Sequence, residues 1–170
     1  LASPSYVTAN IISDCLPEVS QAISGIPFTP VDVVCHGHAT MDVAHPLDGF
    51  GVLIPRHEGF RVLGCLWCDG IFPQQAPKNH HLLRTMIGGA HDLQVEKLSC
   101  TDLEHVVHTE LRKLLGVNRP PQFRRVFRHA KGIAQYTLGH LDRVAATERA
   151  EESLRGLFFT GASYRGVSVN

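Results

Sequence analysis

Apolar residues in the first part of the chain recur at steps of three and four, which is the spacing of one buried face of a helix. These positions are Val7, Ile11, Ile12, Cys15, Leu16, Val19 and Ile23. Pro17 interrupts them, and because proline lacks an amide donor and clashes with the preceding turn, we expect the helix to bend or split there. Residues 1–5, which include Pro4, are typical of a strand that ends in a turn.

Short runs of β-forming residues replace the helical spacing from residue 31 onward. They predict strands at 31–40, 49–55, 60–67 and 81–87. The segments between them are rich in glycine, proline and polar residues, as turns and loops are. This block therefore predicts an antiparallel sheet.

A strongly amphipathic helix is predicted after the sheet. Thr101 to Glu104 has the sequence of a capping box, and Gly116 stands where a C-terminal cap belongs. The apolar stripe between them consists of Leu103, Val106, Val107, Leu111, Leu114 and Leu115. His105 and His108 fall outside this stripe, so we expect both on the solvent face.

The remainder of the chain alternates between strand and helix patterns. A strand is predicted at 123–129, and a helix with Leu141, Val144 and Ala145 turned inward follows it. The final segment, LFFTGASYRGVSVN, is interpreted as a buried strand at 157–160 that enters a glycine-punctuated turn. Such a turn is typical of the approach to a helix N-terminus.

Composition and charge exclude several classes of protein. Apolar residues make up 44% of the chain and charged residues 19%, and sixteen acidic side chains balance sixteen basic ones. We expect a globular protein without a nucleic-acid-binding surface, since such surfaces are strongly basic. No apolar run approaches the roughly 20 residues that cross a bilayer. An odd set of five cysteines fits free thiols in a reducing compartment better than a disulfide framework.

Eleven histidines raise the question of a metal site. His36 and His38 are two residues apart on a predicted strand and therefore share a face, which makes them a potential chelating pair. No third ligand stands at a recognisable spacing from them. Cys65 and Cys68 have C-x-x-C spacing, but residues three apart on a strand point to opposite faces. We therefore predict no metal site and no redox pair.

Five longer motifs occur in order along the chain and together resemble the protoporphyrinogen oxidase family. They are PLDGFGVLIPR (46–56), RVLGCLWCDGIFP (61–73), MIGGAHD (86–92), QYTLGHLDR (135–143) and LFFTGASYRGVSVN (157–170). The resemblance implies an α/β (α+β) fold and the C-terminal portion of such a protein. It implies part of a Rossmann-like FAD-binding domain in 1–30 and 120–170, and an antiparallel-sheet substrate domain with helices in 31–119.

The same resemblance implies an FAD-dependent enzyme of haem biosynthesis. It would oxidise protoporphyrinogen IX to protoporphyrin IX in two-electron steps, with oxygen as the acceptor. Because the flavin does the redox chemistry, we expect no catalytic side chain. Leu53, Leu66 and Met86 match positions where the family places apolar or aromatic side chains against the porphyrinogen. Periodicity alone favours ordinary sheet core for these three residues.

A second set of residues matches the family's turn beside the flavin. It consists of Gly166, Val167, Ser168 and Val169. Small residues there permit close approach of the backbone to the cofactor, and a helix that began at this turn would favour electron-rich atoms near its N-terminus. Without the wider resemblance, Gly161 and Gly166 predict only a tight loop.

Further expectations concern partners, location and alternatives. The resemblance implies a porphyrinogen substrate, peripheral membrane contact, a capacity for homodimer formation, and a location in the cytoplasm or at a membrane, the inner mitochondrial membrane in a eukaryote. His129-Ala130 and Ala134 replace the Trp-Pro and Pro of many relatives, and the sequence contains no G-x-G-x-x-G. We therefore expect a fragment that does not retain FAD alone. A related flavin amine or carotenoid oxidoreductase stays open as an alternative, as does a non-catalytic fragment that binds porphyrin or other partners.

Overall fold

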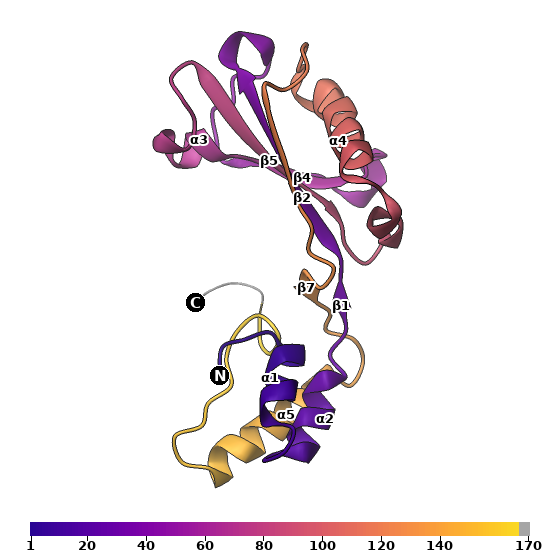
Figure 1. Ribbon diagram of the computed structural model, residues 1–170, viewed down its shortest axis with the longest axis vertical. Helices are drawn as coiled ribbons and strands as arrows, with labels where there is room; N and C mark the ends of the chain where they lie inside the picture. Colours follow the sequence, from indigo (N-terminus) through magenta and orange to yellow (C-terminus); the bar gives the residue numbers. More distant parts are fainter. Residues whose placement is uncertain (167–170) are drawn as a thin grey trace. The chain divides into compact units, whose positions relative to one another are not determined.

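The computed structural model describes residues 1–166 and divides the chain into two compact units (Figure 1). The sheet unit is Pro30–Gly132, and the helical unit joins Leu1–Thr29 to the segment from Ile133 onward. The division after the sheet therefore falls at 132–133 rather than at the expected 119–120. The reason is that the strand β6 (Phe123–Phe127) pairs with β2 (Val31–Ala39) of the sheet. That one unit binds flavin and the other substrate remains a prediction.

The sheet unit is built on a five-stranded antiparallel sheet with the order β3-β4-β5-β2-β6. Its other strands are β3 (Gly51–Leu53), β4 (Val62–Trp67) and β5 (His80–Gly88). All four strands predicted between residues 31 and 87 are present; three are shorter than predicted, and β5 is one residue longer at each end. One-turn helices in the connections are η1 (Thr40–Asp42), η2 (Arg56–Glu58), α3 (Cys68–Ile71), η3 (Pro73–Gln75) and η4 (Leu93–Lys97).

The helix α4 (Cys100–Leu115) packs on one face of this sheet (Figure 1). Its predicted stripe forms the core, with Leu103, Val107 and Leu111 fully buried against strand residues. The predicted N-cap is wrong. Ser99 caps the helix and forms the capping box with Asp102, because its side chain accepts from the Asp102 amide and the Asp102 carboxylate accepts from the Ser99 amide. The C-terminal cap is confirmed, since Gly116 has a φ of 64°.

The helical unit contains α1 (Ser5–Ile12), α2 (Pro17–Ser24) and α5 (His140–Ser153). A two-stranded ribbon of β1 (Phe28–Thr29) and β7 (Ile133–Ala134) belongs to the same unit. Pro17 divides the predicted first helix by occupying the first position of α2, where its missing donor costs nothing. The apolar residues of the three helices form a separate core.

Three predictions within the helical unit are wrong. The strand predicted at residues 1–5 is absent, and α1 already begins at Ser5. Leu141 is 80% exposed, because His140, Val144 and Thr147 take the inward positions of α5. Residues 157–160 are extended but form no strand. Their backbone bonds instead to Leu1 and Glu151: the Leu1 amino group donates to the Phe158 carbonyl, the Leu1 carbonyl accepts from the Thr160 amide at 3.0 Å, and the Phe159 amide donates to Glu151 Oε1 at 2.6 Å.

No helix among residues 1–166 is both long enough and apolar enough to cross a membrane.

Candidate functional site

The sheet face opposite α4, here called the open face, carries all three residues predicted to bind substrate. Leu53 pairs with Gly64, and Gly64 pairs with Met86. Leu66 lies on β4 two residues after Gly64 and therefore points the same way. Because directly paired residues of antiparallel strands share a face, the structure brings the three side chains together. Their contact with a substrate stays a prediction.

One row of this face crosses the whole sheet. From edge to edge it consists of Leu53, Gly64, Met86, Val33 and Phe127. Leu53 is 78% exposed and Phe127 is also exposed. A Cβ atom on Gly64 would lie 2.6 Å from the Val52 carbonyl oxygen, so only glycine fits between these strands. The row is therefore an apolar strip with a low point at Gly64, a shape that suits a flat, apolar ring.

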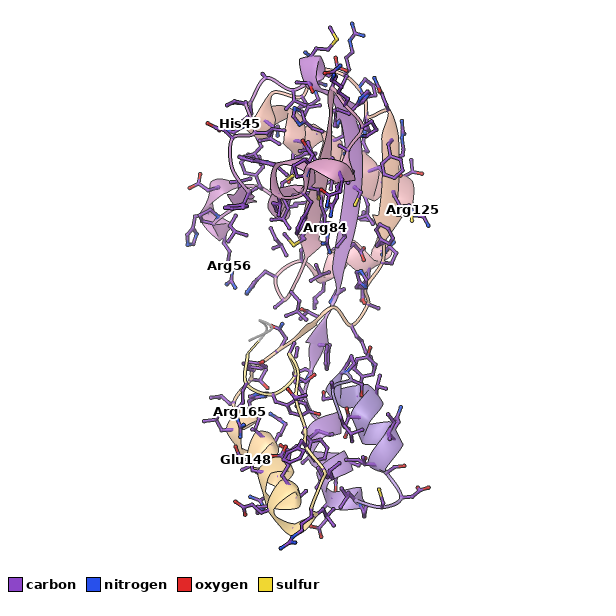
Figure 2. The ribbon with its side chains drawn as sticks, turned by 90° about the vertical axis from the view of Figure 1, so that its left-hand side faces the viewer. His45, Arg56, Arg84, Arg125, Glu148 and Arg165 are labelled. Carbon is purple, nitrogen blue, oxygen red and sulfur yellow. The ribbon has the colours of Figure 1, made fainter. Side chains whose placement is uncertain are left out.

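The next row adds positive charge to the apolar strip. It places Leu66, Arg84, Cys35 and Arg125 side by side, and Figure 2 labels the two arginines. The Arg125 guanidinium carbon lies 5.5 Å from the centroid of the Phe127 ring. Among the described residues neither arginine forms an ion pair. Both cations are therefore available to acidic groups of a ligand.

A hollow of about 260 Å³ opens between the two rows. It is lined by Val33, Cys35, Arg84, Phe127 and His129. Burial raises the pKa of the Cys35 thiol, against the opposing influence of Arg84, so this wall of the hollow is uncharged at neutral pH. Sequence reasoning did not select Arg84, although its position two residues before Met86 on a strand was a usable signal.

The turn predicted to approach the flavin lies in the helical unit, where two separate motifs meet. The Tyr136 hydroxyl donates to the Ala162 carbonyl at 2.7 Å and accepts from the Gly166 amide at 2.9 Å. His140 Nε2 donates to the Tyr164 carbonyl at 2.7 Å. The structure thus joins the QYTLGHLDR motif to the last motif of the chain.

This turn has the backbone that its glycines predict. Gly161 has a φ of 114° and Gly166 a φ of 153°, values that residues with a Cβ rarely adopt. No atom of the described chain lies within 4 Å of the place where a Cβ of Gly166 would be. Gly166 therefore leaves room for close approach of a planar group. Val167, Ser168 and Val169 lie outside the described residues.

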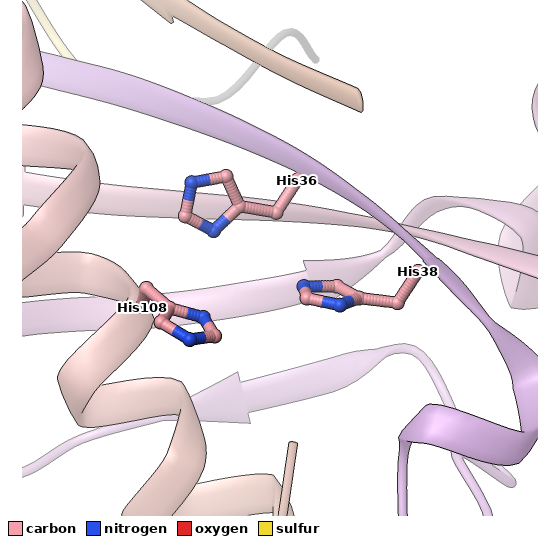
Figure 3. Close-up of side chains that lie close together, drawn as sticks. All are labelled: His36, His38 and His108. Carbon is pink, nitrogen blue, oxygen red and sulfur yellow. The ribbon is translucent and has the colours of Figure 1, made fainter. Parts of the chain in front are cut away.

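The histidines depart from the sequence-based prediction. His36 and His38 share the helix-facing side of β2, as expected. His108 was predicted on the solvent face, but α4 turns it toward these two side chains (Figure 3). The third member of the cluster was missed because it is supplied by a helix seventy residues further along the chain, and no local spacing reports this packing.

The C-x-x-C motif gives two buried thiols rather than a redox pair. Cys65 lies on β4, Cys68 begins α3, and both are free. Burial raises the pKa of Cys65 to about 12 and also raises that of Cys68. Both thiols are therefore protonated at neutral pH, which removes the thiolate that redox exchange requires.

Comparisons with known proteins show the family to which this chain belongs. The chain is a member of the flavin containing amine oxidoreductase family, which matches residues 1–170. It is 32% identical over 156 residues to the mitochondrial protoporphyrinogen oxidase of Nicotiana tabacum, with 90% of this chain and 31% of the relative covered. It is 33% identical to the protoporphyrinogen oxidase of Bos taurus, with 98% and 36% covered. The predicted resemblance to protoporphyrinogen oxidases is confirmed.

A relative with a different named substrate is similar to the same degree. The chain is 30% identical to the coproporphyrinogen III oxidase of Bacillus subtilis, with 99% of this chain and 36% of the relative covered. It therefore spans about a third of the length of the curated relatives that it matches.

Solved structures confirm the predicted fold class. A protein from Exiguobacterium sp. 255-15 that has been assigned as a protoporphyrinogen oxidase superposes with a TM-score of 0.72 at 22% identity, covering 99% of this chain and 36% of that one. A reduced UDP-galactopyranose mutase superposes with a TM-score of 0.65 at 10% identity, covering 89% and 33%. At such identities the agreement concerns the fold alone.

Proposed function

We propose that this chain supplies the substrate-facing sheet and a flavin-facing turn of an FAD-dependent oxidase that converts protoporphyrinogen IX to protoporphyrin IX, with oxygen as the acceptor. The observation that carries the proposal is the open face. Leu53, Leu66 and Met86 come from three strands onto one side of the sheet, with the gap at Gly64 between them. An apolar face of this kind suits a macrocycle that needs orientation more than it needs acid or base groups.

In this proposal the open face would bind the substrate, and the turn at Gly166 would lie beside the cofactor. When bound, FAD would supply the redox chemistry of each step, in which two electrons and two protons leave the porphyrinogen and reach oxygen to give hydrogen peroxide. The apolar row would hold one side of the ring and exclude water from it. Arg84 and Arg125 would pair with the propionate carboxylates at its rim, because neither has an acidic partner in the described chain. Gly166 would allow the backbone to approach the flavin.

Coproporphyrinogen III is a second candidate substrate, favoured by the same two arginines. This macrocycle carries more propionates than protoporphyrinogen IX and correspondingly fewer apolar substituents. Two guanidinium groups that have no ion pair among residues 1–166 lie beside the apolar row and fit such a ligand, and the Bacillus subtilis relative is named for this substrate.

The test uses the full-length protein that carries this chain, purified and examined for FAD by its absorbance. Each porphyrinogen is then supplied in air, and formation of the fluorescent porphyrin is followed. We expect bound FAD and oxidation of protoporphyrinogen IX with the higher kcat/KM. Faster oxidation of coproporphyrinogen III would select the second candidate. Bound FAD without oxidation of either macrocycle would refute both substrates.

The chain contains two methionines, which provide a matched pair of substitutions for the same assay. Met86→Glu places a carboxylate on the open face, whereas Met41→Glu makes the same change at a side chain that is 85% exposed in η1. A carboxylate that loses water against an apolar ring costs about 2 kcal/mol or more, so we expect kcat/KM to fall at least about 30-fold for Met86→Glu. Met41→Glu should stay within about twofold. Equal effects of the two changes would contradict a substrate contact at Met86.

A further inference from the structure

Three histidines converge in the space between β2 and α4 (Figure 3). His36 and His38 point from the strand toward the helix, and His108 points from the helix toward the strand. The ring centroids form a nearly equilateral triangle, with separations of 6.0, 6.1 and 6.3 Å. One ring nitrogen from each residue can be chosen so that all three lie within 4.8 Å of one another.

The polar atoms of this cluster have no partners in the described chain. Both ring nitrogens of His36, both of His38 and Nδ1 of His108 are buried without a hydrogen bond. The His36 and His38 residues are fully buried, with 0% of their surface exposed. Buried side-chain nitrogens nearly always have a hydrogen-bond or metal partner, because leaving one unsatisfied is costly. A single cation at the centre of the triangle would give all three rings a partner at once.

The protonation state of the cluster suits a metal. Burial, reinforced by the neighbouring histidines, lowers the pKa of His36 to about 3 and that of His38 to about 4, although Asp42 opposes the shift at His38. Burial also lowers the pKa of His108. All three imidazoles are therefore neutral at pH 7, which is the form that binds metal ions.

We propose that His36, His38 and His108 bind one divalent zinc ion, with water as the fourth ligand, and that the ion fastens β2 to α4. Three imidazoles without a thiolate or carboxylate match the donor set of zinc. In a tetrahedral site with zinc–nitrogen distances of 2.0–2.1 Å the ligand nitrogens stand about 3.4 Å apart, so rotation of the rings has to bring them closer by no more than about 1.4 Å. His108 is half-buried, whereas His36 and His38 are fully buried, so the helix side of the cluster is the one nearer to solvent.

The zinc site is separate from the proposed substrate surface. His36 and His38 lie on the side of the sheet that α4 covers, and Leu66 and Met86 lie on the other side. The ion would therefore stabilise the packing of strand and helix, without touching the porphyrinogen. This role does not depend on the proposed oxidase activity.

The test titrates zinc into the full 170-residue chain after metal has been removed with a chelator, using competition with a chromophoric chelator to obtain the affinity. His108→Gln removes the ligand from the helix, and His105→Gln makes the same change at an exposed residue of the same helix. We expect one zinc ion per chain, an affinity about 100-fold lower for His108→Gln, and an unchanged affinity for His105→Gln. Zinc should raise the melting temperature of the unsubstituted chain and of His105→Gln, but not that of His108→Gln.

Cobalt(II) gives a second measurement that needs no substitution. In the unsubstituted chain we expect the intense visible absorption of tetrahedral cobalt. We expect no thiolate charge-transfer band, which would appear if any of the five cysteines bound the ion. This spectrum decides the question if His108→Gln does not fold. Equal zinc affinity in the unsubstituted chain and His108→Gln, a thiolate band, or no stoichiometric binding would each overturn the proposal and leave an adventitious ion only.

Discussion

Glu110 is the residue whose loss should most directly loosen α4 from the sheet. Its carboxylate accepts hydrogen bonds from two backbone amides. The Arg61 nitrogen lies 3.0 and 3.1 Å from the two carboxylate oxygens, and the Val62 nitrogen lies 2.9 Å from Oε2. Val62 begins β4 and is buried. Glu110→Ala removes the acceptor from both amides while shortening a side chain that contributes little to the apolar core. The strand then loses its polar attachment to the helix.

The size of the effect follows from the number and kind of hydrogen bonds. Each amide that donates to a charged acceptor contributes about 1.5–3 kcal/mol, and these amides are only partly buried, so water replaces some of the loss. We therefore expect Glu110→Ala to lower the free energy of unfolding of the sheet unit by about 2–4 kcal/mol. Glu110→Gln keeps one acceptor oxygen and should lose about half as much.

Urea unfolding followed by tryptophan fluorescence measures the free energy of unfolding of the sheet unit. The one tryptophan of the chain, Trp67, is buried on β4 and therefore reports on this unit. Glu104→Ala is the matched control on the same helix. Its carboxylate lies 3.6 Å from Arg124, which is largely exposed, so this pair should contribute less than about 1 kcal/mol. The reasoning is refuted if the two alanine variants unfold at the same urea concentration.

Two further predictions concern cysteine reactivity and an ion pair whose carboxylate is buried. At pH 8 a maleimide should modify the exposed Cys15 and Cys100 first, and Cys65, whose pKa burial raises to about 12, only in denaturant; early modification of Cys65 in a mass spectrum would contradict this. Asp32→Ala should destabilise the sheet unit by about 3 kcal/mol in the same urea assay, because the buried Asp32 carboxylate lies 2.8 Å from Nε of Arg128. An unchanged midpoint of unfolding would show that the pair contributes nothing.

The strands and the apolar stripe of α4 could be predicted from the sequence because their signals are local. The β-forming residues of 31–40 mark a strand directly, and the three- and four-residue spacing of Leu103, Val107 and Leu111 marks the buried face of a helix. The cap of α4 was ambiguous, since Ser99 with Asp102 and Thr101 with Glu104 both have a hydroxyl followed three residues later by a carboxylate. Only the helix start selects between them.

The candidate sites depend on contacts between segments that are distant in the sequence. Local sequence patterns do not report such contacts. Leu53, Leu66 and Met86 were selected through the family resemblance, because their spacing alone describes any sheet core. Arg125 joins their face only because β6 pairs with β2, and this pairing also moved the boundary between the units. His108 joins its cluster only through the packing of α4 on the sheet.

The ends of the sheet unit have a consequence for how such a chain can change. The Val31 amide donates to the His129 carbonyl at 3.0 Å, and immediately outside the unit Phe28 pairs with Ala134. The chain therefore leaves the helical unit and returns to it through two adjacent segments, so closing the inserted segment adds little entropic cost to either unit. The sheet unit is therefore an insertion: its length and surface can change while the helical unit keeps the same two attachment points.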